Sequence, residues 1–242
     1  MLVLDLARIF LGTAILAFGS FTDLAWRRAP NALWIALAAG GAVLLAAEVA
    51  LETESVLARW HYLALVPVFI VFIYVMYQLG LIAGGADAKA LMALAILAPF
   101  PLAVAEGLPF APSPMPGPLT ILGNALVAFA FVPLAFAGWN LARGDIRFPA
   151  LLLGYRADVA SLGRTHVWPM ERVEEGKLRL VVFPSRDERD IDEEKAALEA
   201  AGAKRVWVTP KLPFLVPLLV GFVAAWVAGD ALFAIIRAVA GR

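Results

Sequence analysis

Apolar residues in this chain gather into long uninterrupted stretches instead of recurring with the spacing of one helix face. A helix that crosses a membrane needs about 20 consecutive, mostly apolar residues. The sequence contains six candidate stretches, at 2–22, 31–51, 61–81, 87–105, 119–142 and 212–236. The pattern therefore predicts an all-α polytopic membrane protein with about six transmembrane helices. Asn124 and Asn140 lie within the fifth stretch, and we expect both to face protein and not lipid.

A polar segment interrupts this pattern between the fifth and the last apolar stretches. From Arg143 to Lys211 the chain carries 13 lysines and arginines and 12 acidic residues. Two runs, "HVWPMERV" and "KLRLVVF", are joined by "EEG", which indicates a hairpin. "DIDEEKAALEAAG" is acidic at its start and ends in glycine, as helices do, and "AKRVWV" is typical of a strand. We expect a small α+β domain here.

The domain organisation follows from these two patterns. We expect a membrane domain at 1–142, with helices one to five. The soluble α+β domain should occupy 143–211, and the last transmembrane helix and the C-terminus should occupy 212–242. The soluble domain is thus predicted as an insertion before the last helix.

Basic residues between the apolar stretches predict the orientation. The first loop has Arg27 and Arg28, and the third ends near Lys89. The second loop, 48–60, is mainly acidic, and the fourth, 99–118, has no lysine or arginine. Since short cytoplasmic loops are enriched in lysine and arginine, the first and third loops should face the cytoplasm. The N-terminus then lies outside, and the soluble domain is cytoplasmic.

Composition excludes several kinds of chemistry. The chain is 62% hydrophobic, has a net charge of zero, contains no cysteine and has two histidines, far apart in sequence. Without net positive charge, a general nucleic-acid surface is not indicated. Without cysteine, neither disulfides, thiolate metal sites nor cysteine nucleophiles can form. Two distant histidines do not provide a histidine-rich metal cluster, so we expect no metal and no cofactor.

Two aspartates are candidates for catalysis. Asp23 lies at the end of the first predicted span and Asp87 at the start of the fourth, so the topology places both at the cytoplasmic face. Each also has a structural interpretation. Asp87 could cap its helix, because aspartate is a preferred N-cap residue. Asp23 could pair with Arg27 four residues later, although a negative charge near a helix C-terminus opposes the helix dipole.

The residues around these aspartates carry a family resemblance. "DLAWRRAPN", from Asp23 to Asn31, and "GGADAK", from Gly84 to Lys89, resemble the type IV prepilin peptidases. These are membrane aspartic proteases with a G-x-G-D motif. The archaeal branch, the preflagellin and prepilin peptidases, is the more similar. It shares the six spans, a soluble domain before the last span and a segment like Val208 to Phe222.

The resemblance implies an endopeptidase with Asp23 and Asp87 as catalytic residues and no cofactor. Its substrates would be prepilins or prearchaellins with class III signal peptides, which are short basic leaders before an apolar helix. Such a substrate can leave its helix in the lipid bilayer while a site at the cytoplasmic face cuts the leader. The expected supporting residues are Gly84, Gly85, Lys89, Arg27, Arg28 and Asn31. The three basic residues could instead anchor the chain at the cytoplasmic face, and Asn31 could simply help to begin the second helix.

Peptide hydrolysis by two carboxylates needs one ionised and one protonated group at the same time. Two close carboxylates cannot both ionise easily, which provides this state. The helix dipoles would favour Asp87 as the base and Asp23 as the acid. The two glycines beside Asp87 could act as a hinge that draws the pair together when substrate binds.

The sequence departs from the family pattern at two points. Alanine occupies the third motif position, at Ala86, so the backbone there should not need a positive φ. Many bacterial relatives carry paired C-x-x-C motifs in an N-terminal domain and also methylate the cleaved pilin. Since this chain has no cysteine, we expect cleavage without N-methylation.

Two other classes of function remain open at this stage. An ion-coupled transporter could use intramembrane aspartates as a proton relay, but it should place them near the bilayer centre or show paired repeats. A non-enzymatic scaffold could present the α+β domain, and both aspartates would then be replaceable. Self-association into a homo-oligomer is also left open.

Overall fold

The computed structural model describes residues 2–82, 84–102, 114–174, 176–182 and 191–241. The chain divides into two compact units. The first comprises Met1–Phe129 and Pro213–Arg242, and the second comprises Ala130–Leu212. Since helix α6 (Gly117–Arg143) crosses this division, its first half belongs to the first unit and its second half to the second.

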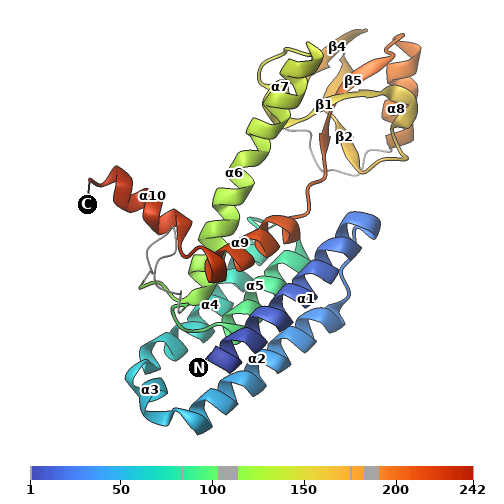
Figure 1. The fold of residues 1–242 in the computed structure, drawn as a ribbon. Coiled ribbons are helices and arrows are strands. Elements are labelled where there is room, and N and C mark those ends of the chain that lie inside the picture. Colours follow the sequence, from blue (N-terminus) through green and yellow to red (C-terminus); the bar gives the residue numbers. More distant parts are fainter. Residues whose placement is uncertain (1, 83, 103–113, 175, 183–190, 242) are drawn as a thin grey trace. The chain divides into compact units, whose positions relative to one another are not determined.

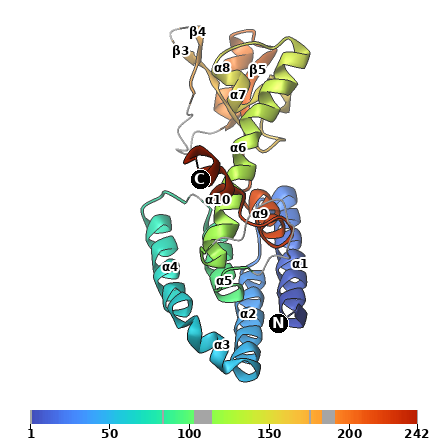
Figure 2. The ribbon, with the colours of Figure 1, turned by 60° about the vertical axis from the view of Figure 1, so that its left-hand side comes forward.

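The first unit is built from helices. In addition to the first half of α6, it contains α1 (Leu2–Trp26), α2 (Asn31–Leu51), α3 (Thr53–Ala58), α4 (Trp60–Gln78), α5 (Gly85–Leu97), α9 (Leu215–Val227) and α10 (Ala231–Val239). Helices α1, α2 and α5 lie side by side (Figure 1). The short α3 reverses the chain between α2 and α4 (Figure 2).

The membrane class predicted from the sequence agrees with these helices. Four of them, α1, α2, α4 and α6, are long and apolar enough to cross a membrane, and α9 with α10 makes a fifth if the bent pair is one span. Large apolar side chains on these helices are exposed, such as Phe10 and Val71. Helices that are apolar all round and exposed to the surroundings are suited to lipid.

The predicted fourth span, 87–105, was too long. Helix α5 ends at Leu97, and the described residues that follow, up to Leu102, are not helical. Pro99 and Pro101 explain this end, because proline restricts the residue before it and supplies no backbone N–H. The remainder of the predicted span, from 103 to 105, lies outside the described residues. With 13 residues, α5 is shorter than the roughly 20 that a span needs.

The predicted last span, 212–236, is also not one helix. Helices α9 and α10 meet at an angle of 76°. Gly229 adopts a φ of 95° at the break, and Asp230 caps α10 by accepting a hydrogen bond from the Phe233 N–H at 2.8 Å. Asn124 of α6 is buried and binds both sides of the break, donating to the Gly229 carbonyl and accepting from the Ala231 N–H, each at 2.8 Å. The expectation that Asn124 faces protein is therefore confirmed.

Helix α5 lies at the centre of the first unit, with most of its side chains buried. Small residues allow the helices to approach closely, as in other membrane proteins. A Cβ at Gly41 of α2 would stand 2.7 Å from the Leu97 Cα of α5. One at Gly221 of α9 would stand 2.5 Å from the Ala125 backbone nitrogen of α6. The α2–α5 and α6–α9 pairs therefore pack backbone against backbone.

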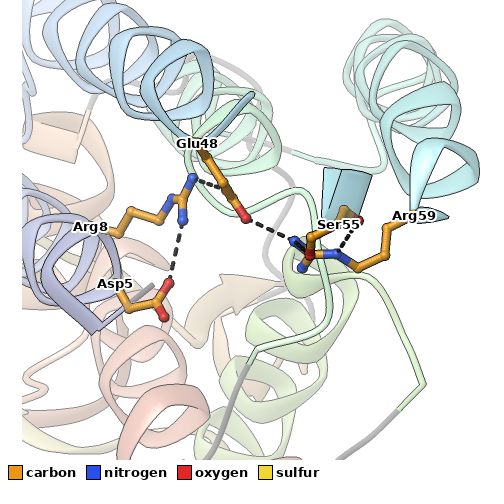
Figure 3. A network of polar contacts seen from close by, with 5 residues as sticks. All are labelled: Asp5, Arg8, Glu48, Ser55 and Arg59. Carbon is orange, nitrogen blue, oxygen red and sulfur yellow. Dashed lines mark hydrogen bonds and ion pairs between the residues drawn. The ribbon is translucent and has the colours of Figure 1, made fainter. Parts of the chain in front are cut away.

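A buried ion network joins α1, α2 and the residues before α4 (Figure 3). Arg8 donates to Asp5 at 3.3 Å and to Glu48 at 2.6 Å. Arg59 donates to the other Glu48 oxygen at 2.9 Å and also to Ser55. Glu48 stands in both the predicted second span, 31–51, and the predicted second loop, 48–60; it belongs to α2 and is only 2% exposed. Its burial is tolerated because two guanidinium groups pair with it.

The second unit is an α+β fold that begins with the second half of α6. It contains α7 (Ala150–Leu153), β1 (Tyr155–Asp158), the 3-10 helix η1 (Val159–Ser161), β2 (Val167–Pro169), β3 (Glu171–Glu174), β4 (Lys177–Leu180), α8 (Ile191–Ala200) and β5 (Arg205–Pro210). The strands form an antiparallel sheet in the order β1-β5-β2 and a hairpin of β3 and β4, labelled in Figure 2. The predicted helix and final strand are confirmed. The predicted hairpin is confirmed in part, because the run 166–173 is divided into β2, which pairs with β5, and β3, which pairs with β4. Asn140 at the end of α6 is buried and donates to two carbonyls of this unit, as expected.

Candidate active site

Asp23 lies in the last turn of α1, and its backbone carbonyl accepts the Arg27 N–H at 2.9 Å. Arg27 then ends the helix with a φ of 54°, the one non-glycine residue at positive φ in the described part of the chain. Such a conformation costs about 1 kcal/mol and is found preferentially at functional sites. No side-chain ion pair joins Asp23 to Arg27 among the described residues. Asp23 therefore does not form the expected ion pair, although the Arg27 charge still acts on its carboxylate.

Asp87 is the third residue of α5 and does not cap the helix. The N-cap position belongs to Gly84, and no side-chain capping hydrogen bond is present. The Asp87 side chain turns back toward the N-terminus, so that a Cβ at Gly84 would lie only 2.1 Å from its Oδ2. Its Oδ1 is buried and has no hydrogen-bond partner among the described residues. Since buried polar atoms are usually paired, this unpaired acceptor needs an explanation other than helix capping.

The glycines before Asp87 are needed because a larger side chain would not fit, and not because the backbone adopts a conformation that only glycine allows. Gly84 has a φ of −96° and Gly85 begins the helix, so neither uses the left-handed region. Ala86 lies in the first helical turn, which explains why alanine fits the third motif position. A Cβ at Gly85 would meet the Tyr77 Oη of α4 at 3.3 Å. The tightest requirement is therefore at Gly84, beneath the Asp87 carboxylate.

Asp23 and Asp87 line one pocket, although they come from helices far apart in the sequence. Its volume is about 590 Å³. The same pocket is lined by every supporting residue predicted from the sequence, namely Arg27, Arg28, Asn31, Gly84, Gly85 and Lys89. Two carboxylates thus face a shared polar space that is large enough for an extended segment of peptide.

Lys89 and Asn31 connect the two sequence motifs directly. The Lys89 Nζ donates to the Asn31 Oδ1 at 2.8 Å, between the first turns of α5 and α2. This bond joins the helix after the first aspartate to the helix that carries the second. It indicates that the two residues hold the mouth of the pocket together. The hydrogen bond goes to Asn31 and not to either aspartate.

Sequence reasoning did not single out two neighbours of the site. Tyr77 places its hydroxyl beside Gly85, and Trp34 of α2 is 4% exposed and packs against Gly19 of α1. Both are aromatic residues in apolar helices, where nothing in the sequence separates them from lipid-facing ones. Only the packing of α2 and α4 against the motif-bearing helices identifies them.

The chemistry available in this pocket is that of two carboxylates. No group of three or more His, Cys, Asp or Glu side chains that could hold a metal ion occurs in the described ranges. Two aspartates that share a polar pocket can activate a water molecule and polarise a carbonyl. The arrangement therefore suits hydrolysis of an amide bond.

Comparison with known proteins agrees with this site. Residues 10–134 match the model of the type IV leader peptidase family, and this range contains both aspartates and all six supporting residues. Residues 147–231 match the archaeal peptidase A24 C-terminus, type II. The chain is 25% identical over 242 residues to a preflagellin peptidase of Methanococcus voltae. That similarity covers 93% of this chain and 97% of the relative.

Proposed function

The chain belongs to the type IV leader peptidase family, and we propose that Asp23 and Asp87 are the catalytic pair with which it cleaves leader peptides from prepilins or prearchaellins. It is a protease of the prepilin and preflagellin peptidase type. One observation carries the proposal for the residues: two aspartates from separate helices line one pocket, and in the described part of the chain neither a helix cap nor a side-chain ion pair accounts for them. The family match disfavours the transporter and scaffold alternatives.

In the proposed reaction, the ionised aspartate removes a proton from water, and the water oxygen attacks the scissile carbonyl carbon. The protonated aspartate donates a hydrogen bond to the carbonyl oxygen. The C–N bond then breaks, and the leaving amine takes up a proton from the pair. Water supplies the hydroxyl of the new carboxyl group and the proton of the new amine, so no metal or cofactor is required.

The helix dipoles alone do not decide which aspartate acts as the base and which as the acid. The dipole of α5 favours a negative charge on Asp87. Its buried Oδ1, however, lacks the hydrogen bonds that an ionised carboxylate usually accepts. These two effects oppose each other, so we propose a pair that holds one proton between its members instead of a fixed acid and base.

The pocket is proposed to lie at the cytoplasmic membrane face, with the N-terminus outside and the domain at 143–211 in the cytoplasm. Arg27, Arg28 and Lys89 at the pocket support this orientation through the positive-inside rule. We further propose six crossings, with α5 as the fourth. Its burial among other helices supports this, because a short helix surrounded by protein does not have to match the lipid thickness alone.

We also propose that cleavage is not followed by N-methylation. Because the chain has no cysteine, it lacks the C-x-x-C motifs that accompany methylation in bacterial relatives. The mass of the new N-terminal peptide, measured after cleavage in the presence of a methyl donor, tests this. An N-methylated product would contradict it.

Asparagine substitutions test the catalytic pair. We expect purified Asp23→Asn and Asp87→Asn proteins to fold and to lose at least about 10³-fold in kcat on a prepilin, as when a member of a catalytic unit is removed. Asp158→Asn, at an exposed aspartate of the second unit, is the matched control and should cleave normally. Cleavage by either site variant at a near-normal rate would contradict the assignment.

A further inference from the structure

Helix α2 links the helices that carry the two aspartates, and α9 packs against α1 as well. Helix α2 packs extensively against both α1, which carries Asp23, and α5, which carries Asp87, whereas α1 and α5 contact each other little. The three helices are seen side by side in Figure 1. A side chain of α2 that reaches between the other two near their catalytic ends would therefore control the distance between the carboxylates.

Helices α2 and α5 run in parallel and in register. Asn31 at the start of α2 bonds to Lys89 near the start of α5, and Gly41 further along α2 contacts Leu97 further along α5. The buried residues Trp34, Leu37 and Gly41 recur with the spacing of one helix face. Trp34 therefore faces α5 at the level of its second turn, about one turn beyond Asp87.

The Trp34 ring also reaches α1. A Cβ at Gly19 would lie 3.0 Å from Cη2 of the indole. Gly19 precedes Asp23 by four residues, so both lie on the same face of α1, one turn apart. By these spacings the indole lies about one turn below both aspartates, against α1 and on the face of α2 that packs against α5. It is 4% exposed and belongs to the same core cluster as Ala88 and Leu91 of α5.

The polar atom of the indole plays no part in this arrangement. Buried tryptophans usually donate their N–H to an acceptor. The Trp34 Nε1 is buried and has no hydrogen-bond partner in the part of the chain that the structure describes. The ring is therefore used for its bulk, at a place where even one methyl group on α1 would press against it.

We propose that Trp34 is a positioning residue that acts as a spacer between α1 and α5 and thereby sets the separation of Asp23 and Asp87. The proposal rests on the proposed function, since it assumes that these aspartates are the catalytic pair. Trp34 touches neither water nor substrate in this role, and acts through the two helices.

Two substitutions should displace the aspartates in opposite directions. Gly19→Ala adds a methyl group against the indole and should push α1 away by a few tenths of an ångström. Trp34→Phe removes the ring atoms nearest Gly19 and should let α1 and α5 approach. Since a displacement of about 1 Å can cost about 100-fold in rate, we expect kcat to fall about tenfold in each variant with little change in KM. The double variant should be faster than either single variant, because the added methyl fills the space that the indole vacates.

Trp226→Phe is the matched control for loss of packing. Trp226 is also buried, belongs to the same core cluster and has an unpartnered Nε1, but it lies on α9. Its substitution should lower stability while kcat stays within about twofold of the parent. Equal losses of kcat in Trp34→Phe and Trp226→Phe would show a general packing effect and overturn the proposal.

A second measurement does not depend on activity. Cysteines introduced at positions 23 and 87, in a chain that has no others, can be joined by crosslinkers of graded length. We expect Gly19→Ala to require a longer reagent, Trp34→Phe to accept a shorter one, and the double variant to resemble the parent. An unchanged length profile in both single variants would refute the spacer. Activity that survives Asp23→Asn would instead refute the proposed catalytic pair and leave the length profile intact, so the two failures are distinguishable.

Discussion

Replacement of Gly84 by alanine should disable the site without unfolding the protein. The new Cβ would be placed 2.1 Å from the Asp87 Oδ2 and 2.8 Å from its Cγ, whereas ordinary contacts begin at 3.4 Å. The carboxylate would therefore have to move by roughly 1 Å. It is the end of a side chain beside an open pocket, so it can rotate away while the helix stays in place. A misplacement of about this size costs on the order of 100-fold in rate.

Gly85→Ala is the control on the adjacent residue. There the new Cβ would meet only the Tyr77 Oη, at 3.3 Å, which a small side-chain adjustment relieves. We expect Gly84→Ala to lower kcat about 100-fold and Gly85→Ala less than about fivefold, with similar thermal stability for both. The assay is cleavage of a purified prepilin at saturating concentration, so that kcat is measured separately from KM.

The same pair of variants tests the hinge predicted from the sequence. A hinge that works through glycine flexibility would suffer comparably from alanine at either position, since both substitutions reduce backbone freedom. If the glycine instead provides space for the Asp87 carboxylate, only alanine at position 84 should lower the rate strongly. Near-normal kcat in Gly84→Ala, or equal losses in the two variants, would refute the steric reasoning.

Three further predictions follow from the site, the orientation and the ion network. Cleavage should persist in excess EDTA and after treatment with serine or cysteine protease reagents, because two carboxylates suffice; loss in EDTA with recovery on adding zinc would contradict this. In intact cells, a cysteine at Asp158 should resist an impermeant thiol reagent while one at Glu54 reacts, and the reverse result would invert the proposed topology. Glu48→Gln should lower the free energy of unfolding by about 3–5 kcal/mol, since Arg8 and Arg59 lose their shared partner; the exposed Glu199→Gln on α8 should change it by less than about 0.5 kcal/mol, and equal effects would refute the role of burial.

The sequence predicted the elements that depend on neighbours in the chain. The β3–β4 hairpin and the helix that ends before Gly202 follow from local turn and helix-end signals. The pocket was predictable because its residues belong to two short sequence motifs. Each motif is continuous in sequence and spans one helix end and the residues next to it. Their meeting could be foreseen because the lengths of the apolar stretches and the loop charges predict both motifs at one membrane face.

The features that the sequence did not predict depend on partners far along the chain. Glu48 stood in both the predicted second span and the predicted second loop, and its pairing with Arg8, 40 residues away, explains how its charge is accommodated in α2. The bend at Asp230 requires Asn124, more than 100 residues earlier. Trp34 has no local signal at all, because its role requires Gly19 on a different helix. Such pairings cannot be read from spacing within one element.

The ion network and the indole act on the same helix at different distances from the catalytic residue. Arg8 is fixed near the start of α1 by Asp5 and Glu48 (Figure 3). At a rise of about 1.5 Å per residue, Gly19 lies about 16 Å and Asp23 about 22 Å along the helix from this point. If α1 moved as a stiff rod about Arg8, a displacement at Gly19 would be about 1.4 times larger at Asp23. In its proposed role the indole contacts α1 close to Asp23, so a small change in its bulk should move the carboxylate relative to Asp87.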